Sequence, residues 1–160
     1  MGPMDRTDYL ASLRRDGDLL LTTAAAGLDR PVPTCPGWTS ERLVGHIGRT
    51  HRWTAGWVAT GESPDVEPAP EGEAVVAWAR TGLDDLVAAL EASDPDAVVD
   101  TWLDRQPAMF WARRMAVETA HAYGRKVNAH TRSIGGTQAC LRAGVDVLYH
   151  CEYSDERTLD

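Results

Sequence analysis

The spacing of hydrophobic residues predicts four helices in the first three quarters of the chain. Apolar side chains recur at intervals of three and four residues in residues 5–26, in a stretch after Thr39 and in residues 73–92. A fourth stretch runs from Pro107 through Trp111 and Met115 towards Gly124. Such spacing places the apolar side chains on one face of a helix. Four helices joined by modest loops indicate a bundle around a shared core. The expected core positions are Leu10, Leu13, Leu20, Leu21, Ala24, Leu43, Ile47, Thr54, Trp57, Val58, Val76, Ala79, Leu83, Leu86 and Leu90.

Residues suited to helix ends mark several of the boundaries. Thr39 is placed to cap the second helix, and Glu41 follows in its first turn, where a carboxylate complements the helix dipole. Pro107 is expected at the first position of the fourth helix, where a proline is tolerated. Gly124 is expected to terminate that helix.

The pattern changes after Gly124. "KVNAH" is typical of a short strand, "IGGTQACLRAG" of a helix closed by Gly144, and "VDVLYHCE" of a second strand. Strand, helix and strand form a βαβ unit with parallel strands. A further helix is expected to start at Ser154. We therefore predict a mainly α protein with two parts, a bundle over residues 4–122 and a βαβ extension over residues 123–160.

Composition and charge narrow the functional classes. The 160 residues carry a net charge of −8, and between Glu62 and Asp104 twelve carboxylates accompany one basic residue, Arg80. This is typical of a solvated face and argues against a nucleic-acid surface, which needs a basic stripe. No apolar run approaches the roughly 20 residues of a membrane span, and no signal peptide is recognisable. Three cysteines without a C-x-x-C pattern favour a reducing, cytoplasmic location.

Two ionisable residues are expected on otherwise apolar helix faces. His46 shares a side of the second helix with Leu43, Trp53 and Trp57, and Glu118 follows Trp111 and Met115 on the fourth helix. A buried polar group needs a partner. His46 is either a neutral core histidine bonded to a carbonyl, a direct partner of Glu118, or a metal ligand. His121, one turn after Glu118, is the candidate third ligand, because catalytic zinc sites use three protein ligands and leave one position open.

Two segments carry a resemblance to a known family. "VPTCPGWTSERLVGHIGRTHRW" and "PAMFWARRMAVETA" resemble the motifs of the mycothiol-dependent maleylpyruvate isomerase N-terminal domain, in the DinB-like superfamily. The resemblance covers about residues 4–120. It implies an up-down-down-up four-helix bundle that holds a divalent metal, usually zinc. It also implies a small thiol such as mycothiol and a small organic acid as partners in isomerase or transferase chemistry, since coordination to a metal deprotonates a thiol.

The resemblance assigns metal ligands residue by residue. Two family positions are His46 and Glu118. The third is a histidine four residues after the glutamate, which is Ala122 in this chain. His121 lies one residue earlier and projects about 100° around the helix from the expected direction, so it replaces that ligand only if the last turn is distorted. His51 is expected at the surface or in a supporting contact.

The tail resembles a different family. "GRKVNAH" and "AGVDVLYHCEYSDE" are similar to part of the amidohydrolase superfamily, in which the matching histidines, His130 and His150, end two strands of a (β/α)₈ barrel and bind metal. Such a barrel needs on the order of 250 residues, so this tail supplies an incomplete site. The chain therefore looks like a junction of two unrelated genes near residues 117–122. An isolated two-stranded sheet is weak, and we expect this tail to pack loosely on the bundle, to fray, or to pair with a second copy in a homodimer.

Three functional hypotheses remain open at this point. The first is a divalent-metal-binding bundle with thiol-dependent isomerase or transferase ancestry. The second is a non-catalytic bundle whose core histidine and glutamate simply pair with each other. The third is a metal-dependent hydrolase that uses His130 and His150 with ligands supplied by other chains.

Overall fold

The computed structural model describes residues 5–101, 105–131 and 133–151. The mainly helical fold predicted from the pattern is confirmed. In chain order, the elements are α1 (Arg6–Ala25), α2 (Ser40–Thr60), α3 (Ala74–Ala92), β1 (Val98–Asp100), β2 (Arg105–Pro107), α4 (Met109–Ala122), β3 (Asn128–Thr131), α5 (Ile134–Ala143) and β4 (Val147–His150).

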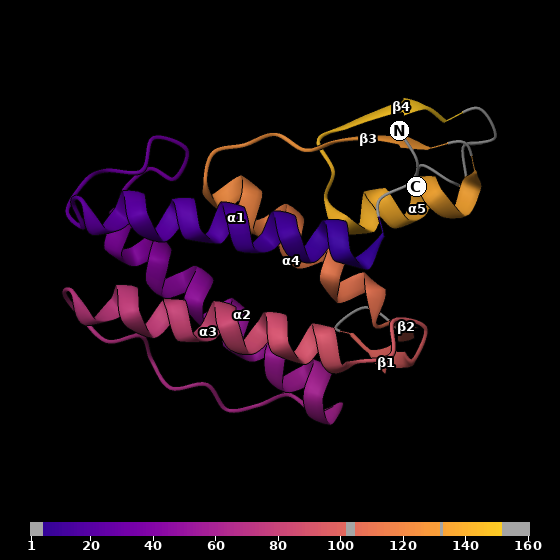
Figure 1. The fold of residues 1–160 in the computed structure, drawn as a ribbon. Coiled ribbons are helices and arrows are strands. Elements are labelled where there is room, and N and C mark those ends of the chain that lie inside the picture. The colour runs from indigo at the N-terminus through magenta and orange to yellow at the C-terminus, as the bar shows by residue number, and fades with distance from the viewer. Residues whose placement is uncertain (1–4, 102–104, 132, 152–160) are drawn as a thin grey trace.

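The four long helices lie side by side as a bundle (Figure 1). The loop between α2 and α3 runs back along the bundle, so these two helices point the same way, and α1 and α4 point the other way. The directions are therefore up, down, down and up. The closest packing is between α2 and α3, and α1 packs mainly on α4 and α3.

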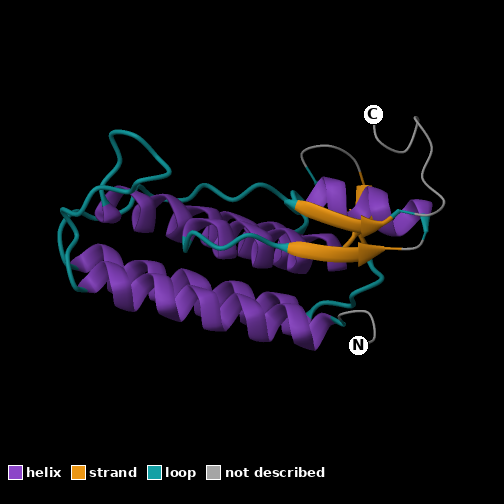
Figure 2. Ribbon diagram, turned by 90° about the horizontal axis from the view of Figure 1, so that it is seen from above, coloured by secondary structure: helices purple, strands orange, loops and turns teal. Residues whose placement is uncertain are grey.

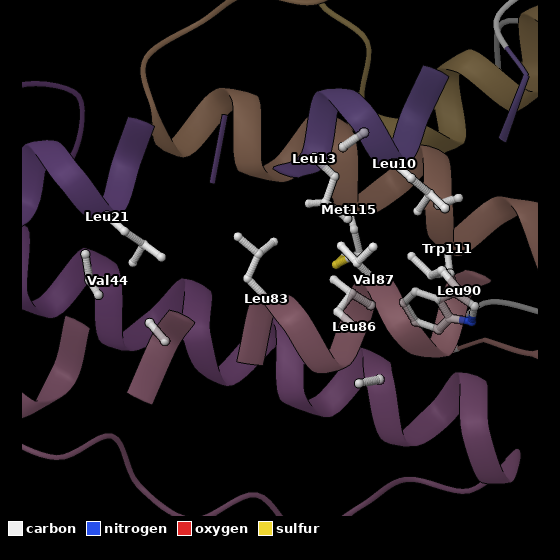
Figure 3. Close-up of a cluster of buried hydrophobic side chains, with 14 of the residues drawn as sticks. Leu10, Leu13, Leu21, Val44, Leu83, Leu86, Val87, Leu90, Trp111 and Met115 are labelled. Atoms are coloured by element: carbon white, nitrogen blue, oxygen red, sulfur yellow. The ribbon is translucent and has the colours of Figure 1, made fainter. Parts of the chain in front are cut away.

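The core fills the space between α1, α3 and α4 and extends to α2. Leu13, Leu86 and Trp111 are fully buried, and Figure 3 shows their cluster with Met115 of α4. Every expected core leucine of α1 and α3 is buried, whereas Trp57, Val58 and Val76 are only partly buried. Hydrophobic burial of this kind is the main favourable term in folding. The stripes read from the sequence therefore identify the core faces of α1 and α3 correctly.

The helix boundaries confirm two expected caps and correct a third. The Thr39 hydroxyl accepts a hydrogen bond from the Arg42 N–H at 3.3 Å, as predicted for a cap of α2. Gly124, with φ of 77°, follows the end of α4. Pro107 is not in α4, which begins two residues later. It pairs with Val98 in an antiparallel pair of short strands, β1 and β2, that the hydrophobic pattern did not predict.

The tail forms the predicted βαβ unit. β3 and β4 are parallel, with Asn128 opposite Val147 and Thr131 opposite His150, and Figure 2 shows both arrows pointing the same way beside α5. The helix α5 ends at Gly144, whose φ is 79°, as expected. α5 packs on α4. The helix expected from Ser154 lies outside the described residues.

One finding concerns membranes. Among the residues that the structure describes, every helix is too short or too polar to cross a bilayer.

Candidate metal centre

The Cys-Pro-Gly-Trp motif forms a tight turn in front of α2. The Trp38 N–H donates to the Cys35 carbonyl at 3.0 Å, and Gly37 between them has a φ of 80°, which favours glycine. The turn sets the Trp38 ring edge-on to the His46 ring, with centroids 5.4 Å apart. The Arg42 guanidinium lies over the Trp38 ring, 4.7 Å from its centroid. The motif therefore positions an aromatic side chain against the first candidate ligand.

His46 is exposed, so its expected place in the core is wrong. The prediction correctly grouped His46 with Trp53 and Trp57, but that side of α2 is only partly buried. At 100° per residue, the buried face of α2 is centred on other positions, with Val44 near its middle. His46 therefore lies at the rim of the bundle, within reach of solvent.

The histidine buried in the bundle is His51. Its residue exposure is 3%, and its Nε2 lies 2.9 Å from the Thr119 hydroxyl of α4. Burial lowers the pKa of His51 to about 4, because the charged imidazolium loses its hydration. The ring is therefore neutral at pH 7. Of the two placements expected for His51, at the surface or in a supporting contact, this burial excludes the surface. The spacing from Val44 through His51 to Ala55 is the sequence feature that points to this burial.

Glu118 is half-buried and has a cation beside it. Its carboxylate forms an ion pair with Arg114, one turn earlier on α4. Arg114 Nη1 also approaches the Arg142 carbonyl, at 3.5 Å, near the end of α5. A cation at a helix C-terminus is favourable. Arg114 thus balances the charge of the second candidate ligand and links it to the tail.

His121 faces the tail. Its Nε2 lies 2.8 Å from Asp146 Oδ2, and the same oxygen accepts a hydrogen bond from the Val127 N–H at 2.7 Å. The Val127 N–H and then His121 hold the pKa of Asp146 below its ordinary value. The third candidate ligand therefore joins the end of α4 to the start of β4. This orientation towards the tail is consistent with a histidine one residue before the position expected for the third ligand, because one residue turns a side chain by about 100° around the helix.

Ala122 stands at the position that the resemblance gives to the third ligand. Its methyl group packs against a small cluster formed by Leu20, Leu43 and Ile47, and Trp38 packs against the same cluster. Because Trp38 also contacts His46, the family position lies at the same end of the bundle as the first candidate ligand. A side chain that cannot bind metal therefore stands where the resemblance leads one to expect a third ligand.

The candidate ligands are not assembled into one site. Over residues 5–101, 105–131 and 133–151, no group of three or more His, Cys, Asp or Glu side chains is arranged to hold a metal ion. Instead, His46 contacts Trp38, Glu118 pairs with Arg114, and His121 binds Asp146. These side chains do not fit the three-ligand set of a catalytic zinc.

The tail histidines lie close together, as expected from their places on parallel strands. The His130 ring stacks on Tyr149, with centroids 4.8 Å apart, and lies 5.1 Å from the His150 ring. Both histidines are exposed, and His150 has a φ of 76°. Their role as metal ligands stays a prediction.

Comparisons with known proteins agree with the family of the bundle. A family model described as the mycothiol maleylpyruvate isomerase N-terminal domain matches residues 10–122. Proteins of Mycobacterium tuberculosis and Mycobacterium bovis, both described as uncharacterized, are 32% identical over 111 residues. The match covers 66% of this chain and 26% of each relative, so the chain spans about a quarter of the length of these relatives. No solved structure matches.

Proposed function

The chain belongs to the mycothiol maleylpyruvate isomerase N-terminal domain family, and we propose that it is a DinB-like bundle with an incomplete metal centre. His46 and Glu118 remain as a weak site for a divalent metal such as zinc, and the protein does not turn over substrate. The observation that supports this proposal is the packing of Ala122, at the position expected for the third ligand, against Leu20, Leu43 and Ile47.

The chemistry explains why two ligands are too few. A catalytic zinc is held by three protein ligands while the fourth position receives water or substrate. In a thiol-dependent reaction, the metal supplies the charge that deprotonates a small thiol such as mycothiol. With two protein ligands the ion is held weakly, and Glu118 must also leave Arg114 before it can bind metal.

The ion pair supports a structural role for Glu118. A half-buried carboxylate is costly without a cation, and Arg114 provides that cation in the absence of metal. Arg114 also contacts the end of α5. Glu118 therefore orients Arg114, which contacts the tail. In this proposal, the small organic acid and the thiol of the family are partners of an ancestral bundle and not of this chain.

Zinc titration tests the partial site. Since His130 and His150 lie close enough to bind zinc themselves, the titration is done on His130→Ala. We expect weak binding that becomes weaker still when His46→Ala is added. As a matched control, Arg49→Ala removes another exposed side chain of α2 and should leave the affinity unchanged. Equal affinity with and without His46 would contradict the site.

A turnover assay tests the absence of catalysis. Zinc-saturated full-length protein is incubated with mycothiol and maleylpyruvate, and the loss of maleylpyruvate is followed. We expect no rate above that of the buffer with zinc. Thiol-dependent turnover that Glu118→Ala abolishes would overturn the proposal, because it would show that the two-ligand centre is sufficient.

A further inference from the structure

A cavity lies at the contact between the bundle and the tail, and its described lining contains none of the candidate metal ligands. Its volume is about 190 Å³, and its wall includes Phe110 and Arg113 of α4 and Gly135, Ala139 and Arg142 of α5. For comparison, a dry cavity of about 150 Å³ in another protein holds benzene. The space is therefore sufficient for a molecule with one aromatic ring or a short aliphatic chain.

Two arginines, Arg113 and Arg142, line this cavity without a described counter-ion. Among the residues that the structure describes, neither Arg113 nor Arg142 forms an ion pair, although the whole chain carries a net charge of −8. Seven other arginines of the described residues, Arg114 among them, pair with a carboxylate. Paired guanidinium groups are well suited to bind a carboxylate.

The positive charge of Arg113 affects two neighbouring groups, and the N-terminal turn of a helix lines the same cavity. Burial raises the pKa of both the Tyr9 hydroxyl and the Cys140 thiol, and the charge of Arg113 opposes each rise. Gly135 lies in the first turn of α5, where the helix dipole is positive. The lining thus contains two cationic residues, Arg113 and Arg142, together with apolar residues such as Phe110 and Ala139.

We infer that this cavity binds a small organic carboxylate, with the acid group between Arg113 and Arg142 and the apolar body against Phe110 and Ala139. The ligand class follows from the combination of two cations, an aromatic wall and the volume. Neither His46 nor Glu118 belongs to the lining of this cavity. Ligand binding there therefore does not require the incomplete metal centre proposed above.

Benzoate is the probe, and benzamide is its neutral analogue of the same shape. Two-dimensional NMR of the full-length protein follows the backbone signals of α5 and the Nε–H signals of Arg113 and Arg142. We expect saturable shifts with benzoate and about tenfold weaker binding, or less, of benzamide, since a hydrogen bond to a charged group is lost. Inorganic phosphate should bind more weakly than benzoate, because it lacks an apolar body.

Three variants locate the site. Arg113→Gln and Arg142→Gln should each weaken benzoate binding by about tenfold or more, whereas Arg49→Gln, on an exposed position of α2 outside the cavity, should not change it. Gly135→Leu should block the cavity. A Cβ at Gly135 meets no atom within 4 Å, and leucine favours a helix more than glycine does, so this variant keeps α5 folded.

The outcomes divide clearly. Saturable benzoate binding that Gly135→Leu abolishes and Arg49→Gln preserves supports the site. The inference is overturned if benzoate and benzamide bind alike, if phosphate binds as well as benzoate, or if Gly135→Leu leaves benzoate binding intact.

Discussion

The bundle and the tail differ in how completely their apolar side chains are buried. In the bundle, α1, α3 and α4 share a core in which Leu13, Leu86 and Trp111 are fully buried. In the tail, two parallel strands leave both outer edges unpaired within the described residues, and Leu141 and Tyr149 are 42% and 45% exposed. Parallel sheets are normally covered on both faces, so the tail depends on the bundle for its stability.

The contacts between the two regions involve the side chains that family chemistry would require for metal. Arg114, the partner of Glu118, contacts the end of α5, and His121 binds Asp146 at the start of β4. A third link joins Arg125, after α4, to the buried carboxylate of Asp16 on α1, at 3.6 Å. The polar end of α4 thus holds the tail against the bundle.

The largest expected difference between the regions concerns the loss of a buried leucine. Leu86→Ala should lower the free energy of unfolding by about 2–5 kcal/mol, because it leaves a cavity in the core. Leu141→Ala, at an exposed position of α5, should change it by about 0.5 kcal/mol or less. Urea denaturation followed by tryptophan fluorescence measures both. Similar losses for the two variants would show that the tail has a core of its own.

The next effect is a dependence of bundle stability on pH. His51 has a folded pKa of about 4, below the ordinary value of about 6.5. The unfolded chain therefore binds the proton more readily, and stability falls as the pH is lowered from 7 to 4. The loss is roughly 3 kcal/mol, from about 1.4 kcal/mol for each unit of pKa difference.

Denaturation at several pH values checks this prediction. His51→Gln should remove most of the slope between pH 4 and 7, although it also weakens the bundle at pH 7. His130→Gln, which replaces an exposed histidine of the tail, should leave the slope as it is. The account of His51 fails if the slope is unchanged in His51→Gln.

The smallest effect is expected at the link between the regions. Asp146→Asn weakens the contacts with His121 and the Val127 N–H, so the tail should detach more often while the bundle stays folded. Trypsin should then cut residues 125–132 a few times faster than in the original chain, since cleavage follows the population of locally open states. Asp100→Asn, in β1, is the control. Equal rates for Asp146→Asn and the original chain would contradict the link.

The fold follows from the sequence where spacing and packing agree. Leucines at three- and four-residue intervals located α1 and α3, and Gly144 located the end of α5. The pair of strands β1 and β2 was missed because three-residue strands have too little alternation to recognise. Pro107 was then assigned to the helix that follows.

The site was harder to read because a periodic face does not state which of its edges is buried. His46 and His51 both lie on plausible sides of α2, but packing against α4 buries His51 alone. The roles of Glu118 and His121 depend on Arg114 and on Asp146, which is 25 residues beyond His121 in the chain. Asp146 is a long-range partner without a signature in local spacing, whereas Arg114 lies four residues before Glu118, which is the spacing of a helical ion pair.

The central claim is that the metal centre lacks a third ligand because residue 122 is alanine. The most direct test is zinc titration of Ala122→His, in the His130→Ala background, against the same background with Ala122 retained and against Ala122→Asn, which is of similar size. The account predicts at least about tenfold tighter binding with histidine alone, lost again with His46→Ala. Unchanged affinity in Ala122→His, or equal tightening in Ala122→Asn, would contradict it.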